Sequence, residues 1–448
     1  MDSLVDYKLD KDIFSNDEQY FFTLLSTRFE LVNDRLAKLL ERKYDKKFKP
    51  IYILSAPYNK FFQKENYIIL NKKLKELKKK LKINNLIFLQ EYEELNEEFS
   101  ESGFIGEIIK NLAKKQENIF FISFTSSFLK LNHPKLFLLG PDPMIATKYD
   151  NKIEQIKLFK DLDLPRNETK IYENIELIRK DIDRLLPFFI SSAYTSGGHE
   201  SATIHTLEEL NAFYNTIREI NKSQKFLVAK LIKNIKLSPN TNAIVFGENK
   251  TEIIAITDQI LRSNAYLGNI YPSRVNLRNR QIIIETTKKI GNFLSKLGYR
   301  GLFGCDFLID GKGNCFVIDL NPRRQGGYLV NYLMSKKIDV LELELKLYLN
   351  QKLPSFNYDD FQSNFVWAHS KLKSHHRFQE IIGELKENEE VTPFRSIGGG
   401  EFKATFFPKG FLFEGGNMGY YIVSGKNYED ILRKAKEIPE ILLIQNLE

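Results

Sequence analysis

The chain has 448 residues, which exceeds the size of one compact core and predicts two or three domains. Its net charge of +8 is compatible with an anionic partner, but the lysines at residues 72–80 alternate with leucines at helical spacing, so a solvated helix face is the better interpretation. No apolar run reaches the roughly 18 residues that a transmembrane helix needs, and residues 1–6 are acidic. We therefore expect a cytoplasmic protein with neither nucleic acid nor a membrane as its partner.

Strand-like and helix-like segments alternate through the first part of the chain. Residues 16–43 carry apolar side chains at helical spacing, which predicts one or two leading helices. Apolar runs at residues 51–54, 86–89 and 119–124 are separated by charged, helix-patterned stretches. Such alternation predicts a parallel α/β domain. Two prolines and a glycine at residues 138–143 end the pattern, and we place a domain boundary there.

A helix and a polar loop follow this boundary. Residues 148–159 have a helical pattern that closes at Leu164 and Pro165. Residues 187–204 then read as a strand, a small polar loop and a second strand. The loop is rich in glycine and hydroxyl groups, so its backbone N–H groups could approach phosphate oxygens, with a plain hairpin turn as the alternative.

The middle of the chain reads as two further strands. Residues 226–233 form an apolar run, and a polar bend at residues 237–242 separates it from the next run at residues 243–246. Arg274 lies beyond these strands. Its fork could bind an acidic substrate or a phosphate, although plain surface exposure is the alternative.

The segment at residues 301–327 indicates the chemistry most clearly. Two apolar runs flank a turn-rich connection, so Asp306 and Asp319 fall on neighbouring strands at the same end of a hairpin. Two carboxylates and the Asn321 amide, without sulfur or imidazole, suit Mg²⁺ or Mn²⁺. Arg323 follows, where a planar cation can hold a phosphate or carboxylate beside the metal. Ordinary turn residues are the alternative for each of these positions taken singly.

Both cysteines, Cys305 and Cys315, lie in the predicted strands of this hairpin. We expect them to be small buried hydrophobes rather than a disulfide. Glycine turns separate short apolar runs between residues 398 and 423, which predicts a small β-rich region. The histidines near residues 369–376 have no cysteine or carboxylate at ligand spacing, so we expect no zinc site there.

The ordered set Asp306, Asp319, Asn321, Pro322 and Arg323 resembles the metal-binding hairpin of the ATP-grasp superfamily. The chain is similar to the carboxylate–amine ligase branch, which joins amino acids and peptides, over roughly residues 50–440. The resemblance implies an α/β and α+β protein in three parts. These are an N-terminal parallel α/β pre-ATP-grasp domain (1–140), an ATP-grasp domain (141–350) with a flap subdomain at about 165–228, and a small C-terminal β-rich cap (351–448).

The same resemblance implies roles for individual residues. Asp306, Asp319 and Asn321 would be the metal ligands, and Arg323 with Arg274 would be catalytic. Substrate would meet Arg324, Gly326 and Gly327. The residues expected to bind ATP are Lys152 (with Lys148 as second choice), Ser191, Ser196, Gly197, Gly198, Lys230 and Leu231.

The implied reaction uses ATP and Mg²⁺ or Mn²⁺ to phosphorylate a carboxylate. An amine then attacks the acyl phosphate and releases phosphate, because a carboxylate is a poor electrophile until its oxygen becomes a leaving group. The expected substrates are a small carboxylate, such as an amino acid, and a small amine. A carrier protein as partner and a homodimer both remain open.

Two departures from the family pattern leave alternatives open. Ser191 stands where a second nucleotide-binding lysine is usual, and Ala229 or Lys230 stands where an acidic residue is customary. Either another cation such as Lys230 neutralises the phosphates, or the chain is a catalytically silent nucleotide-binding protein. A biotin-carboxylase-like carboxylase is disfavoured, because Asp306 and Asp319 stand where that group has glutamates.

Overall fold

The computed structural model describes residues 5–8, 17–25, 30–54, 66–70, 95–131, 133–194, 200–218, 225–262, 265–328, 338–361, 366–373, 395–397, 400–406, 417–425 and 427–430. The chain divides into two compact units. Unit 1 comprises Met1–Gly140, Gly327–Phe356 and Asp360–Glu448, and unit 2 comprises Pro141–Gly326 and Asn357–Asp359. Among the residues just given, no helix combines the length and apolar character needed to cross a membrane.

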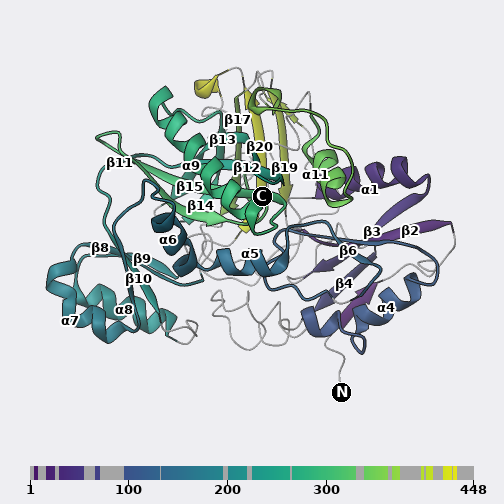
Figure 1. The fold of residues 1–448 in the computed structure, drawn as a ribbon, viewed down its shortest axis with the longest axis horizontal. Coiled ribbons are helices and arrows are strands. Elements are labelled where there is room, and N and C mark those ends of the chain that lie inside the picture. Colours follow the sequence, from purple (N-terminus) through teal and green to yellow (C-terminus); the bar gives the residue numbers. More distant parts are fainter. Residues whose placement is uncertain are drawn as a thin grey trace, which may run out of the picture. The chain divides into compact units, whose positions relative to one another are not determined.

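Unit 1 contains a six-stranded sheet with the strand order β1-β4-β3-β2-β5-β6. Figure 1 labels β2, β3, β4 and β6 of this sheet. Strands β4, β3, β2, β5 and β6 run parallel to one another, while β1 is antiparallel to β4. Helix α4 (Phe104–Leu112) buries Ile105 and Ile109 against this sheet, in a core that includes Phe22 and Phe121. The strands are β1 (Val5–Lys8), β2 (Glu18–Leu24), β3 (Lys47–Leu54), β4 (Asn66–Leu70), β5 (Ile119–Ser123) and β6 (Leu136–Leu138).

The prediction of helix from residue 16 onward is wrong for its first part. Residues Glu18–Leu24 form β2, and helix α1 begins only at Glu30 and ends at Tyr44. Strand β2 is central in the sheet, and its five inner residues are all buried. Such a strand reads as a continuous apolar run, which periodicity alone cannot separate from a buried helix. The strand expected at residues 86–89 lies outside the described residues.

The C-terminal part of unit 1 forms antiparallel strands, in the order β17-β20-β19-β18. Strands β19 and β20 confirm the β-rich character predicted for this region. Helix α11 (Val340–Tyr348) also belongs to unit 1, and its N-cap Asp339 pairs with Arg35 of α1 at 2.6 Å. The strands are β17 (Val366–Lys373), β18 (Arg395–Ile397), β19 (Gly400–Phe406) and β20 (Asn417–Gly425).

One part of unit 2 is a small antiparallel sheet with the order β7-β10-β8-β9. Helices α7 (Ile175–Leu185) and α8 (Leu207–Ile217) lie beside this sheet (Figure 1). They bury Ile178 and Leu210 in its core. The strands are β7 (Thr169–Tyr172), β8 (Phe188–Ser192), β9 (Ser201–Ile204) and β10 (Phe226–Lys230).

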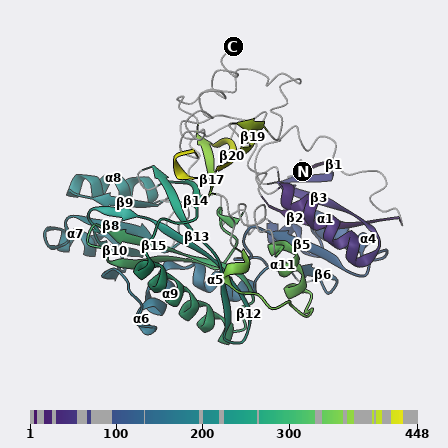
Figure 2. The same ribbon diagram turned by 90° about the horizontal axis from the view of Figure 1, so that it is seen from above.

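The other part of unit 2 is an antiparallel sheet in the order β11-β15-β12-β13-β14, with β16 paired to β15. The long helix α9 (Leu277–Lys296) covers one face of this sheet (Figure 2). Its residues Ile283, Ile290 and Leu294 are buried there. The opposite face is therefore free to carry polar side chains. The strands are β11 (Ile235–Leu237), β12 (Pro239–Gly247), β13 (Lys250–Arg262), β14 (Ala265–Tyr271), β15 (Gly301–Asp310) and β16 (Cys315–Asn321).

Two local predictions in unit 2 need correction. Residues 240–242 are not a bend, because they pair with both β13 and β15 as part of β12. The helix expected at residues 148–159 is two helices, α5 (Pro143–Asp150) and α6 (Lys152–Asp161). Asn151 separates them, because its extended backbone lets its side chain cap the amide of Ile153. Both cysteines are free and buried, as predicted.

Candidate active site

The hairpin of β15 and β16 places three polar side chains on one face of the sheet. Asp306 is directly opposite Asp319, and Gly304 is opposite Asn321. The register shifts between Asp306 and Phe307, which leaves Ile318 as an extra residue immediately before Asp319. Because alternate residues of a strand share a face, this register puts Asp306, Asp319 and Asn321 together.

Asp306 is the centre of a hydrogen-bond network. The Asn240 amide of β12 donates to Asp306 Oδ1, and Asn321 Nδ2 donates to Asp306 Oδ2 at 3.3 Å. Burial is the main cause that raises the pKa of Asp306 to about 6, and the nearby charge of Asp319 adds to it. Two carboxylates so close together attract a cation, since a cation relieves their mutual repulsion.

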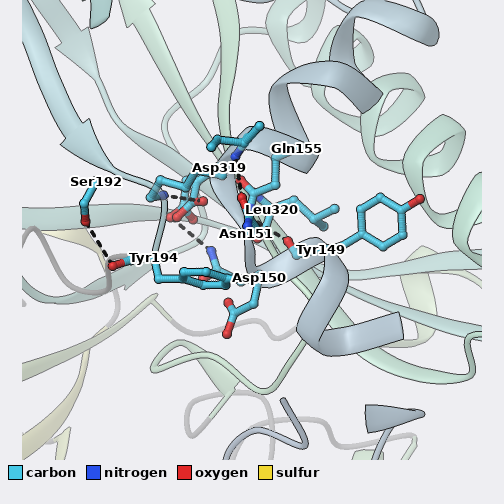
Figure 3. Close-up of polar contacts among 12 residues, drawn as sticks. Tyr149, Asp150, Asn151, Gln155, Ser192, Tyr194, Asp319 and Leu320 are labelled. Carbon is cyan, nitrogen blue, oxygen red and sulfur yellow. Dashed lines mark hydrogen bonds and ion pairs between the residues drawn. The ribbon is translucent and has the colours of Figure 1, made fainter. Parts of the chain in front are cut away.

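Two cations already flank the carboxylates. Lys152 Nζ, at the start of α6, lies 2.7 Å from Asp319 Oδ1. Arg323 donates from one terminal nitrogen to Asn321 Oδ1 at 2.6 Å, and its Nε lies 4.0 Å from Asp150 Oδ1. Figure 3 shows Asp319 beside Leu320 and Gln155, where β16 faces the start of α6. The site therefore alternates negative and positive groups.

The donor set fits a hard divalent cation. Asp306, Asp319 and Asn321 offer carboxylate and amide oxygens, which Mg²⁺ and Mn²⁺ prefer, and leave further coordination positions to water or phosphate. The half-buried carboxylate pair supplies the charge that such an ion needs. Within the described residues, no group of three or more His, Cys, Asp and Glu side chains is placed to hold a metal ion. A metal here would thus depend on two aspartates, one asparagine and its other ligands.

The segment after β16 packs flat on the polar face of the sheet, which requires two glycines. A Cβ on Gly304 would lie 1.9 Å from Gln325 Oε1 and 2.4 Å from the Thr241 carbonyl oxygen. A Cβ on Gly326 would lie 2.3 Å from the Tyr266 hydroxyl. Gln325 also accepts from Asn240 at 3.2 Å. Gly304 and Gly326 therefore let this segment reach from β15 to Tyr266 of β14.

Residues 150–327, which contain this site, match the sequence model of the ATP-grasp domain. This chain carries an ATP-grasp domain. Among solved structures, the biotin carboxylase domain of 2-oxoglutarate carboxylase from Hydrogenobacter thermophilus has a similar fold, with a TM-score of 0.65 and 14% identity. The similarity covers 93% of this chain and 88% of that one. The predicted fold class and the ATP-grasp resemblance are confirmed.

Two relatives are also similar in sequence. An L-propargylglycine–L-glutamate ligase from Streptantibioticus cattleyicolor is 29% identical over 110 residues, which are 24% of this chain and 22% of the relative. A [butirosin acyl-carrier protein]–L-glutamate ligase from Niallia circulans is 20% identical over 244 residues, which are 53% of this chain and 58% of the relative. The chain thus covers less than two thirds of each relative's length.

Several residues predicted to bind nucleotide lie in or beside the small sheet of the ATP-grasp domain. Ser191 is buried in β8, opposite Leu227 and Ser201, while Lys230 ends β10 with an exposed side chain. Leu231 follows it directly. The Lys152 backbone N–H donates to the Ala193 carbonyl at 2.8 Å, so the end of β8 is tied to the start of α6.

The other predicted site residues have different surroundings. Ser196, Gly197 and Gly198 lie outside the described residues, and Lys148 lies in the last turn of α5. Arg274 is bound by Asp258: the Asp258 carboxylate accepts hydrogen bonds from the backbone N–H and the Nε of Arg274, both at 3.0 Å. Thr257 lies opposite Asn240 in the sheet, and Asp258, the next residue of β13, faces the other side. Arg274 is therefore bound on the face of the sheet away from Asn240. Arg324 is only 2% exposed, and Gly327 is buried.

Sequence reasoning missed three residues of the ATP-grasp site. Asn240 bridges Asp306 and Gln325, Tyr266 abuts Gly326, and Gln155 binds the backbone between Asp319 and Asn321. A usable signal existed only for Asn240. Three polar residues in succession, Asn240, Thr241 and Asn242, directly precede an apolar strand run and are a signal that polar side chains have partners there.

Proposed function

We propose that this chain is an ATP-dependent ligase that joins a carboxylate to an amine through an acyl phosphate. One arrangement on the polar face of the ATP-grasp sheet carries the proposal. Asp306 and Asp319 form a pair, and Asn321 makes hydrogen bonds to both Asp306 and Arg323. The two relatives support it, because both are named as ligases.

The residues divide the chemistry as follows. Asp306, Asp319 and Asn321 would hold Mg²⁺, which supplies neutralising charge beside the phosphates of ATP. Arg323, held by its hydrogen bond to Asn321, would present its guanidinium group to the oxygens that gain charge as the phosphoryl group moves. Lys152 would move from Asp319 to a phosphate oxygen when nucleotide binds. Gly326 lets the Tyr266 ring lie against the backbone where substrate is proposed to bind.

We propose L-glutamate as one of the two substrates, because the names of both relatives describe ligation with L-glutamate. The second substrate is an amino acid or another small carboxylate or amine. The relative from Niallia circulans acts on an acyl-carrier protein, so a carrier-bound substrate belongs in the first test.

The test is ADP release in the presence of Mg²⁺, L-glutamate and a panel of amino acids, small acids and a loaded carrier protein. Substrate labelled with ¹⁸O in its carboxylate should transfer one labelled oxygen to inorganic phosphate, because the acyl phosphate loses that oxygen when the amine attacks. ADP release without label in phosphate would rule out carboxylate activation.

A second candidate function rests on Ser191, which stands where a nucleotide-binding lysine is usual. On that reading the chain binds nucleotide without turning it over. Tight ADP binding, combined with no substrate-dependent ADP release across the whole panel, would favour this alternative over a ligase.

A further inference from the structure

The side chain of Gln155 in α6 binds the backbone of Leu320, the residue between Asp319 and Asn321. Its Oε1 accepts from the Leu320 N–H at 3.0 Å, and its Nε2 donates to the Leu320 carbonyl at 2.7 Å. Nε2 also donates to the Tyr149 carbonyl at 2.8 Å. Figure 3 shows Gln155 beside Leu320 and Tyr149. Gln155 is 2% exposed, so water does not compete for these three hydrogen bonds.

Strand β16 needs such a contact because its ladder is interrupted. The extra residue Ile318 immediately precedes Asp319, and a bulge of this kind re-aims the side chains that follow it. On one side of the bulge, the Val317 N–H donates to the Pro165 carbonyl at 2.8 Å. On the other side, Gln155 takes both backbone groups of Leu320. The bulge is thereby fixed on both sides.

Gln155 also connects the groups that surround the carboxylates. Lys152, which binds Asp319, lies one helical turn before Gln155, so the two residues share a face of α6. Tyr149 precedes Asp150, the residue whose carboxylate faces Arg323. The buried amide of Gln155, near the start of α6, thus links the end of α5 to the end of β16.

We propose that Gln155 is a positioning residue for the metal site, because it sets the backbone from which Asp319 and Asn321 project. The inference rests on the proposed function, since the metal-ligand role of those two residues belongs to it. Residues that orient metal ligands typically change metal affinity or activity by about 10–100-fold when they are replaced.

The chain contains a matched control. Gln116 in unit 1 makes the same three kinds of bond: its Oε1 accepts from the Tyr20 N–H at 3.0 Å, and its Nε2 donates to the carbonyls of Tyr20 at 2.9 Å and Asn118 at 3.2 Å. It is 4% exposed. Replacing either glutamine by methionine keeps the side-chain length and leaves one backbone N–H and two carbonyls without that partner. The free energy of unfolding should therefore fall by a similar amount in both variants.

The experiment measures Mn²⁺ binding in the presence of ADP, from the loss of the free-ion signal in electron paramagnetic resonance. Thermal unfolding of each variant is followed in parallel. We expect Gln155→Met to raise the Mn²⁺ concentration for half-saturation about 10–100-fold, while Gln116→Met leaves it at the wild-type value. Gln155→Asn keeps the amide but shortens its reach, and should change Mn²⁺ binding in the same direction.

Each outcome has a distinct meaning. Wild-type Mn²⁺ affinity in Gln155→Met, or an equal loss in Gln116→Met, overturns the positioning role while leaving the proposed function intact. If Gln155→Met does not fold, Gln155→Asn decides. If neither folds while Gln116→Met does, Gln155 is structural and the proposal is abandoned. Failure of the wild-type protein to bind Mn²⁺ with ADP would instead contradict the proposed function.

Discussion

Lys152 and Asp319 are 167 residues apart in the chain, yet the lysine ammonium lies 2.7 Å from the carboxylate. Both side chains are largely shielded from water, at 17% and 22% exposure. The ammonium therefore offsets one of the two paired carboxylates before any ligand binds. Nucleotide and metal together would replace this ion pair, with the metal at Asp319 and a phosphate at Lys152.

Replacing this lysine should weaken nucleotide binding. We expect Lys152→Met to raise the Kd for ATP with Mg²⁺ about tenfold, the effect of losing one charge-assisted contact to phosphate. Isothermal titration calorimetry measures it. Lys157→Met is the matched control, because Lys157 lies on the same helix and pairs only on the surface, with Glu154 at 2.7 Å. Equal affinities in the two variants would remove Lys152 from the nucleotide site.

The metal ligands can be tested without turnover. Asp319→Ala and Asn321→Ala should abolish Mn²⁺ binding in the presence of ADP, because each change removes an oxygen ligand. The cooperative thermal transition should remain, because neither side chain belongs to the hydrophobic core under α9. Asp183→Ala, on the exposed face of α7, serves as the control. Normal Mn²⁺ binding by a variant that combines Asp319→Ala with Asn321→Ala would show that the metal lies elsewhere.

Arg323 separates a ligase from a protein that only binds ATP. Its fork can engage two phosphoryl oxygens together, which a lysine cannot reproduce. We expect Arg323→Lys to lower kcat about a hundredfold with little change in ATP affinity. Steady-state kinetics and ATP titration measure the two effects, and Arg278→Lys at the exposed start of α9 is the control. Near-normal turnover, or a parallel loss of ATP binding, would contradict this role.

Gly304 should resist enlargement. A methyl group there would meet the Thr241 carbonyl at 2.4 Å as well as Gln325, and backbone cannot move aside as a side chain can. We expect Gly304→Ala to lower the free energy of unfolding by about 1–3 kcal/mol, the cost of overpacking. Gly311→Ala is the control, since its nearest contacts would be 3.4 Å away. Urea unfolding distinguishes them, and equal stability would mean that β15 and Gln325 adjust freely.

Glu200 should make the stability depend on pH. Burial raises its pKa above the usual 4.5, although the Ser192 hydroxyl donates to it and partly offsets this effect. The folded state therefore holds the proton more tightly, so stability falls as pH rises from 4.5 through the folded pKa. We expect Glu200→Gln to unfold at a higher temperature than wild type at about pH 7 and at the same temperature below about pH 4.

Thermal scans at both pH values measure this difference. Glu285→Gln, on the exposed side of α9, is the control, because Gln281 already donates to Glu285 at 2.6 Å and an amide oxygen can accept the same bond. If Glu200→Gln and wild type unfold at the same temperature at both pH values, the charge of the Glu200 carboxylate does not destabilise the folded state.

The sequence by itself determined the centre of the site, because that centre is local. Asp306 and Asp319 belong to two strands joined by a short turn, so the hairpin pairing that places them opposite each other follows from nearby residues. Asn321 and Arg323 follow Asp319 within a few residues, so they lie beside the two carboxylates. Their chemical types then indicated an oxygen-ligated metal beside an anion-binding arginine.

Only the tertiary structure decided which distant residues complete the site. Gln155 and Leu320 are 165 residues apart, and Asn240 and Asp306 are 66 apart, so no local pattern links them. The same holds for β2, which periodicity assigns to a helix. It is a strand because β3 and β5 pair with it on both sides, and β5 begins almost a hundred residues later. Pairing across such separations depends on the whole folded chain, and single-sequence patterns do not record it.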